Sequence, residues 1–140
     1  MKIYLAGGMH TEWRERVKRE VQGPKYLDPT THGLDDPKAY TAWDIEAIKQ
    51  SDLVVAYFEM SNPVGFNMAY EMGYASCANI EVLFINERFA DNPRPVSMLC
   101  ERSHTVATLD VAIEWLHARV AAVAGAGWSD PFGDRFRTPY

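Results

Sequence analysis

The sequence predicts an α/β fold, in which one parallel sheet of about five strands is flanked by helices. Short apolar runs alternate with longer amphipathic runs along the 140 residues. The run Leu53–Phe58 (LVVAYF) is apolar throughout, as expected for a strand covered on both faces. Alternating strands and helices indicate a flavodoxin-like or Rossmann-like parallel sheet with helices on both faces. The length suits one core, so we expect a single domain over residues 1–140.

The first half of the chain supplies three strands and two helices. Trp13, Val17 and Val21 recur at i, i+4 and i+8, which predicts one buried helical face. A segment rich in turn formers separates the second strand from the second helix. In chain order we expect strand Lys2–Ala6, helix Thr11–Val21, strand Lys25–Leu27, loop Asp28–Pro37, helix Ala39–Gln50 and strand Leu53–Phe58.

The second half continues the alternation. We expect loop Glu59–Val64, a helix from about Gly65 to Cys77, strand Glu81–Ile85, a short strand within Ser103–Thr108 and helix Leu109–Val123. The tail from Gly125 is rich in glycine, proline and charge, yet it carries four aromatic side chains. We therefore expect it to dock on a surface, through Trp128, Phe132, Phe136 and Tyr140.

Composition limits the functions that are open to this chain. A hydrophobic fraction of 47% with 24% charged residues is typical of a globular protein. The net charge of −5 gives no electrostatic footprint for a nucleic-acid polymer or an anionic membrane. No apolar run approaches the ~18 residues of a membrane span, and the N-terminus lacks a signal-like apolar segment. We expect a soluble, cytoplasmic protein.

Neither the cysteines nor the histidines indicate a metal site. Cys77 and Cys100 are too few for a disulfide scaffold, so we expect two reduced, buried thiols. The histidines show no ligand spacing, and the one in the last helix is expected at the surface; they are His10, His32, His104 and His117. We expect no metal and no cofactor.

Ligands of parallel sheets bind beyond the carboxyl ends of the strands, which here singles out the loops after Ala6, Leu27 and Phe58. The first of these begins with Gly7 and Gly8. Glycines at this point allow backbone N–H groups to approach an anion or a sugar, or they simply form a tight turn. The loop is neither a GxGxxG nor a Walker sequence, so neither a dinucleotide nor a triphosphate is indicated.

Two carboxylates stand out on the helices. Glu71 falls in the second turn of its helix, and the residues on the same face are apolar or able to hydrogen-bond: Asn67, Met68, Tyr74 and Ala75. A lone carboxylate there is a functional group or half of a buried ion pair. Asp44 lies at the edge of the buried side of its helix, while Glu46 points away. It is a functional group or an ordinary solvated carboxylate.

Three segments in the right order resemble the nucleoside 2-deoxyribosyltransferase superfamily, which includes nucleoside 5′-monophosphate N-glycosidases. Lys2–Gly7 (KIYLAG) is similar to the family's opening strand. Asp44-Ile45, followed after an interval by Asp52–Ala56 (DLVVA), is similar to its central helix and next strand. Glu71–Ala75 (EMGYA) is similar to its nucleophile motif. The resemblance covers about residues 1–100.

The resemblance implies an enzyme that breaks an N-glycosidic bond. Glu71 would attack the anomeric carbon of the sugar and form a covalent glycosyl-enzyme. Tyr4 would hold Glu71, orienting it and keeping it ionised. Asp44 would meet the nucleobase and assist its protonation as it departs.

The resemblance also implies how the substrate is held. Ser97 and Met98 would reach into the site of a neighbouring subunit, so that a homo-oligomer, a dimer or larger, completes the site. This chain has Ser97 where the transferases typically carry asparagine, and the resemblance implies that this serine favours a substrate with a 5′-phosphate. Other candidate phosphate, sugar or base contacts are Gly7, Gly8, Met9, His10, Ser61, Asn62, Gly65, Asn67 and Phe66.

One departure leaves alternatives open. Many transferases carry a second aspartate six residues before the nucleophile, where this chain has Gly65. The sequence therefore allows three functions: a transferase that passes the sugar to another base, a nucleotide N-glycosidase that passes it to water, and a non-catalytic nucleotide-binding module.

Overall fold

The computed structural model describes residues 1–126, which include five parallel strands in a single sheet. The strands are β1 (Lys2–Gly7), β2 (Lys25–Leu27), β3 (Leu53–Phe58), β4 (Glu81–Asn86) and β5 (His104–Val106). Their order across the sheet is β2-β1-β3-β4-β5, and each neighbouring pair is parallel. The predicted α/β architecture is confirmed, and each strand lies within a residue or two of its predicted bounds.

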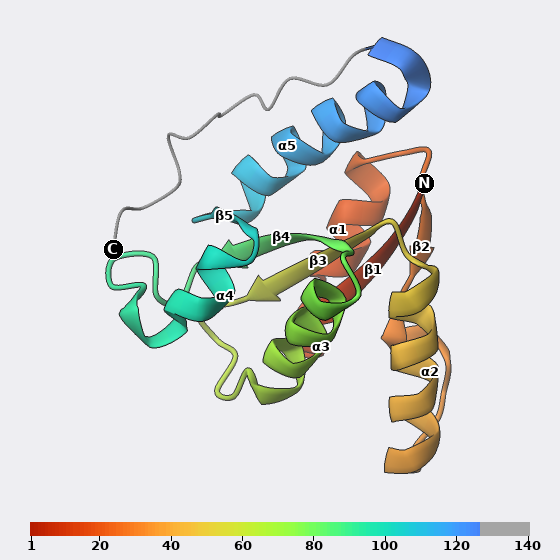
Figure 1. Cartoon of the computed structure of the whole chain (residues 1–140), viewed down its shortest axis with the longest axis vertical. Helices are drawn as coiled ribbons and strands as arrows, with labels where there is room; N and C mark the ends of the chain where they lie inside the picture. The colour runs from red at the N-terminus through yellow and green to blue at the C-terminus, as the bar shows by residue number, and fades with distance from the viewer. Residues whose placement is uncertain (127–140) are drawn as a thin grey trace.

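Helices cover both faces of this sheet (Figure 1). On one face lie α1 (Trp13–Glu20) and α5 (Leu109–Ala121), whose buried side chains join those of alternate strand residues. On the other lie α2 (Pro37–Gln50), α3 (Phe66–Cys77) and the short α4 (Ser97–Glu101). Tyr4 and Ala6 face this second layer, whereas Ile3 and Leu5 face the first. All six residues of β3 are buried.

Helix α1 is shorter than the predicted Thr11–Val21, and ends of two further helices differ from the prediction for local reasons. Helix α2 begins at Pro37, because Asp36 caps it by accepting from the amide of Ala39 and proline suits the first helical turn. Helix α5 ends at Ala121 and passes into a π-helical turn over Ala122–Ala126, where Gly125 has a φ of 100°. Such a positive φ is readily adopted by glycine.

The segment before β5 contains helical structure that the pattern did not predict. A 3₁₀ turn (Arg94–Val96) leads into α4, and this pair buries only Val96 and Cys100. Five helical residues are too few to show a period. The expectation of two buried thiols is wrong for Cys77, which is exposed at the end of α3, and right for Cys100. The predicted docking of the aromatic tail concerns residues outside those that the structure describes.

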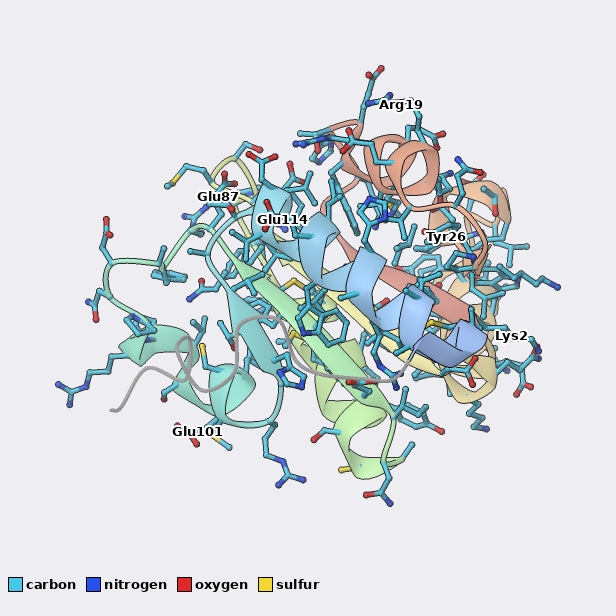
Figure 2. All side chains as sticks on the ribbon, turned by 90° about the horizontal axis from the view of Figure 1, so that it is seen from above. Lys2, Arg19, Tyr26, Glu87, Glu101 and Glu114 are labelled. Carbon is cyan, nitrogen blue, oxygen red and sulfur yellow. The ribbon has the colours of Figure 1, made fainter. Side chains whose placement is uncertain are left out.

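The register aligns the carboxyl ends of the central strands. Gly7 of β1 lies opposite Tyr57 of β3, and Tyr4 lies opposite Leu27 of β2. Between β1 and β3 the strand order reverses, which is where ligands bind in such sheets. Figure 2 shows Glu87, just beyond β4, and Lys2, at the start of β1, on opposite sides of the view. Within residues 1–126, no helix combines the length and apolarity needed to cross a bilayer.

Candidate active site

The residue with the strongest sequence signal makes a direct contact across the fold. The hydroxyl of Tyr4, on β1, donates a hydrogen bond of 2.7 Å to Oε1 of Glu71, on α3. Tyr4 is fully buried and Glu71 half-buried. Burial and the Glu71 charge raise the pKa of the Tyr4 hydroxyl far above its usual value, so the phenol stays neutral and keeps donating.

Asp44, on α2, completes a group of three side chains from three elements. It is half-buried, and its charge raises the pKa of both Glu71 and Tyr4. Its Oδ1 atom is buried and, among the residues described, has no hydrogen-bond partner. The structure therefore brings together Tyr4, Asp44 and Glu71, the three residues that the sequence singled out for chemistry.

Both carboxyl groups hold protons more tightly than in water. Burial raises the pKa of Glu71 from 4.5 to about 7; the Asp44 charge adds to this, while the Tyr4 hydrogen bond and the Arg14 charge oppose it. Burial also raises the pKa of Asp44. The expectation that Tyr4 keeps Glu71 ionised is therefore only half right. Its hydrogen bond does favour the carboxylate, but the loss of water outweighs it.

Arg14 is the residue that the sequence analysis missed most clearly. Its side chain is buried beneath the first loop, and its guanidinium donates hydrogen bonds of 2.6–3.2 Å to the carbonyl oxygens of Leu5, Gly7 and Gly8. It also pairs with buried Asp28 at 3.5 Å. One signal was available: position 14 lies three residues before Val17, on the buried face of its helix.

The glycine loop is closely packed against β3. Gly7 has a φ of 143°, and a Cβ there would lie 2.6 Å from the carbonyl oxygen of Tyr57. A Cβ on Gly8 would lie 2.9 Å from Oε1 of Glu59. These contacts support a tight turn; the approach of a sugar or anion stays a prediction. Met9 and His10, the other candidates in this loop, are exposed.

The loop after β3 is ordered by charged residues that the sequence analysis did not select. Buried Glu59 accepts a hydrogen bond of 2.6 Å from the Thr11 hydroxyl, and Arg88 donates to the carbonyl oxygen of Asn62. The Asn62 side chain is buried and accepts from the amide of Val64 at 3.2 Å. Of the remaining candidates, Ser61 and Asn67 are exposed, Gly65 is the half-buried cap of α3, and Ser97 is half-buried at the start of α4.

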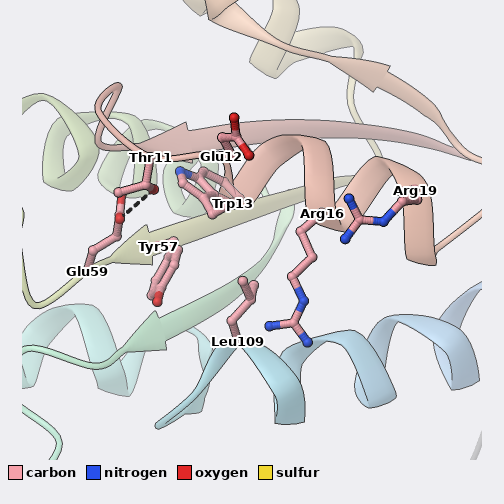
Figure 3. A pocket seen from close by; sticks show the side chains of 8 residues that line it. All are labelled: Thr11, Glu12, Trp13, Arg16, Arg19, Tyr57, Glu59 and Leu109. Carbon is pink, nitrogen blue, oxygen red and sulfur yellow. Dashed lines mark hydrogen bonds between the residues drawn. The ribbon is translucent and has the colours of Figure 1, made fainter.

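A separate pocket of about 360 Å³ lies on the other face of the sheet, between α1 and α5 (Figure 3). Trp13 and Tyr57 form part of its wall, with ring centroids 5.5 Å apart, and Arg16 and Leu109 face each other across it. Glu71 does not line this pocket. Buried Glu59 lines this pocket, but the group of Tyr4, Asp44 and Glu71 lies on the opposite layer of the sheet, and we place the candidate active site there.

The fold and the carboxylate group define an α/β protein with an acidic site at the carboxyl edge of a parallel sheet. The chain belongs to the family described as "Nucleoside 2-deoxyribosyltransferase like", whose model matches residues 1–89. Members of this kind are nucleoside-modifying enzymes, including transferases and an N-glycosidase. A comparison with curated proteins found no match.

Solved structures agree with the fold. The chain is similar to a 2-deoxyribosyltransferase from Bacillus psychrosaccharolyticus, with 18% identity, 86% of this chain and 96% of that chain covered, and a TM-score of 0.65. It is also similar to a CMP N-glycosidase from Clostridium botulinum, with 17% identity, 81% and 95% coverage and a TM-score of 0.60. A conserved protein from Enterococcus faecalis V583 gives 20% identity, 85% and 98% coverage and a TM-score of 0.58. At these identities the likeness establishes the fold.

The raised pKa of Glu71 predicts a pH-dependent cost to stability. Below pH 4.5 the carboxyl is protonated in both the folded and the unfolded chain, so it costs nothing. Between pH 4.5 and about 7 the unfolded chain loses this proton before the folded chain does, so the free energy of unfolding falls as the pH rises and levels off above about 7. We expect Glu71→Gln, whose amide oxygen still accepts from Tyr4, to be more stable than wild type by on the order of 2 kcal/mol at pH 8. Urea unfolding at pH 4.5 and pH 8 measures this, and an equal difference at both pH values would contradict it.

The buried guanidinium predicts a large loss of stability on its removal. Arg14→Met leaves the buried Asp28 without this partner and several carbonyl oxygens without a donor, so we expect unfolding free energy to fall by about 3 kcal/mol or more. Arg16→Met is the matched control, because Arg16 makes its ion pairs at the surface of the same helix. We expect the control to lose less than about 1 kcal/mol. Equal losses in the two variants would show that Arg14 does not hold the loop.

Proposed function

We propose that this protein cleaves the N-glycosidic bond of a (2′-deoxy)nucleoside or its 5′-monophosphate through a covalent glycosyl–Glu71 intermediate, and then transfers the sugar to another base. The observation that carries the proposal is the Tyr4–Glu71 hydrogen bond with Asp44 beside it. Membership of the family supports the class of reaction. The acid group and its geometry support the assignment of Glu71 as the nucleophile.

The first half of the reaction needs one ionised and one protonated carboxyl group. Tyr4 donates to Oε1 of Glu71, which leaves Oε2 to attack C1′ of the sugar. As the C1′–N bond breaks, the proton of Asp44 passes to the departing base, whose nitrogen takes the bonding electron pair. Burial raises the pKa of both carboxyl groups, that of Glu71 to about 7, and the proposed reaction requires their shared proton to lie on Asp44 when Glu71 attacks.

The second half reverses these roles. The acceptor base attacks C1′ through a ring nitrogen, the ester bond to Glu71 breaks, and the electron pair returns to the Glu71 carboxylate. Asp44, now ionised, takes the proton that the acceptor nitrogen loses. Each group thus returns to its starting state, and no cofactor is consumed.

Hydrolysis is the second candidate, because the covalent intermediate is common to both. Water in place of the acceptor base gives free sugar or sugar phosphate. The similarity to a CMP N-glycosidase and the serine at position 97 favour this route and a 5′-phosphate. Buried Glu59, beside Gly8 and Asn62, places an acidic group next to the proposed phosphate contacts and opposes a phosphate there. A non-catalytic nucleotide-binding module is the third candidate.

A second copy of the chain completes the site in this proposal. Large apolar side chains are exposed on α4 and at the amino-terminal part of α3: Val64, Phe66, Tyr70 and Met98, which are 56%, 81%, 64% and 82% exposed. Large apolar side chains that are exposed on two neighbouring helices favour a protein interface. Contact between these surfaces would bring Ser97 and Met98 of one copy to the Glu71 site of the other.

Substitution of Glu71 tests the reaction directly. We expect Glu71→Ala to lower kcat at least about 1,000-fold, which corresponds to about 4 kcal/mol, because no other group attacks C1′. Glu46→Gln on the exposed side of α2 is the control and should keep full activity. Chromatography of bases released from a panel of deoxynucleosides, ribonucleosides and their 5′-monophosphates measures both variants.

The same panel separates the candidate functions. Exchange with an added free base, without net release of sugar, identifies a transferase, whereas free sugar phosphate identifies a hydrolase. Mass spectrometry of quenched wild type should find the sugar on the peptide that contains Glu71. If wild type binds nucleotides but releases base from none of them, the binding module is the better account.

The proposed subunit contact predicts a variant that separates oligomerisation from folding. Met98→Glu adds a charge where the monomer exposes the side chain, so monomer stability should change by less than about 0.5 kcal/mol. We expect it to shift the protein toward monomer in analytical ultracentrifugation and to lose activity in parallel. Val123→Glu, at another exposed apolar side chain, beyond α5, is the control. A Met98→Glu variant with unchanged mass and unchanged activity would exclude this interface.

A further inference from the structure

His32 is held in a defined position beside the candidate active site. It follows the 3₁₀ turn Pro29–Thr31, in the connection between β2 and α2, and its side chain is only 10% exposed. Its Nδ1 accepts a hydrogen bond of 2.9 Å from the amide of Leu34. Its ring packs edge-on against Trp43 of α2, with centroids 4.9 Å apart and planes at 63°. The ring is therefore fixed by a backbone contact at one nitrogen and by an aromatic contact.

The other ring nitrogen faces an oxygen atom that lacks a partner. Nε2 of His32 lies 3.9 Å from Oδ1 of Asp44, the atom that is buried without a hydrogen bond among residues 1–126. A neutral imidazole whose Nδ1 accepts carries its proton on Nε2. A donor and an unsatisfied acceptor thus face each other at a separation about 1 Å longer than a hydrogen bond.

Other groups around Asp44 do not replace this contact. The titratable or charged groups that face it are Tyr4 from β1, Glu71 from α3, Arg14 from α1 and His32. The Tyr4 hydroxyl lies close enough to Asp44 to lower its pKa, but its single proton is donated to Glu71 at 2.7 Å, and the Arg14 guanidinium is engaged by backbone carbonyl oxygens. Buried carboxylate oxygens without donors cost free energy, and the cost grows when the group ionises.

We propose that His32 is a positioning residue for Asp44: its Nε2–H closes onto Oδ1 and fixes the carboxyl so that Oδ2 faces the departing base. This inference rests on the proposed function. When Asp44 gives its proton to the base, the negative charge that remains is stabilised by the Nε2–H hydrogen bond. The histidine keeps its own proton throughout. His32 therefore acts on base departure and not on the attack by Glu71.

A comparison of leaving groups tests this division. On a nucleoside whose base needs a proton to leave, we expect His32→Ala to lower kcat about 10- to 100-fold and to change KM less than about 3-fold. On a 4-nitrophenyl glycoside of the same sugar, whose phenolate leaves without a proton, we expect a loss of less than about 3-fold. His32→Gln, whose amide can still donate to Asp44, should recover most of the lost rate. His117→Ala, exposed on α5, is the control.

A second measurement does not depend on catalysis. The carboxyl of Asp44 is titrated by carbon-13 NMR in wild type and in His32→Ala, and we expect its pKa to rise in the variant because the Nε2–H donor that favours the carboxylate is lost. An unchanged Asp44 pKa in a folded variant, or equal losses on the nucleoside and the aryl glycoside, overturns the inference. If wild type cleaves neither substrate but the Asp44 pKa shifts, the proposed function fails while the His32–Asp44 contact stands.

Discussion

The carboxyl edge of the sheet depends on one buried guanidinium. Arg14 reaches from α1 to the end of β1, where it donates to the carbonyl oxygens of the glycine loop, and it pairs with Asp28 at the end of β2. It thereby joins α1, the end of β1 and the end of β2, next to the point where the strand order reverses. Its positive charge is also the cation that lowers the pKa of both Glu71 and Asp44. Structural and electrostatic roles coincide because the loop and the carboxylates lie at the same strand end.

Near this cation lie two carboxyl groups whose pKa values are raised by burial. The pKa of Glu71 rises to about 7, and the charge of Asp44 contributes to that rise. A pair of this kind readily holds one proton, which is the state that nucleophilic attack with assisted departure requires. The neutral Tyr4 phenol contributes a hydrogen bond but no charge. The titration behaviour is therefore a property of the group of side chains and not of Glu71 alone.

The sequence predicted the strands and helices that have a clear local pattern. It missed Arg14 and His32, whose roles depend on contacts between distant parts of the chain. The apolar runs that became β1, β3 and β4 are bounded by glycine or charged residues, so their ends were visible. Helix α4 is too short to show a period. Glu71, Asp44 and the contact of Glu71 with Tyr4 were expected from the resemblance, whereas the effect of the Arg14 charge on both carboxyl groups arises only when strands and helices pack. His32 carried no signal, because nothing in its neighbours indicates that its ring faces Asp44.

Packing around position 65 bears on the number of acids near the proposed base site. Position 65, where many transferases carry a second aspartate, is a glycine whose Cβ would lie 3.0 Å from the ring of Phe58. A longer side chain there would have to displace an aromatic residue that also packs against Phe89 at 5.6 Å. A second carboxylate at this position would therefore require the Phe58 ring to shift. In the proposed reaction, the absence of this second aspartate leaves Asp44 as the acid for the base, so the orientation of Asp44 that we assign to His32 becomes more important.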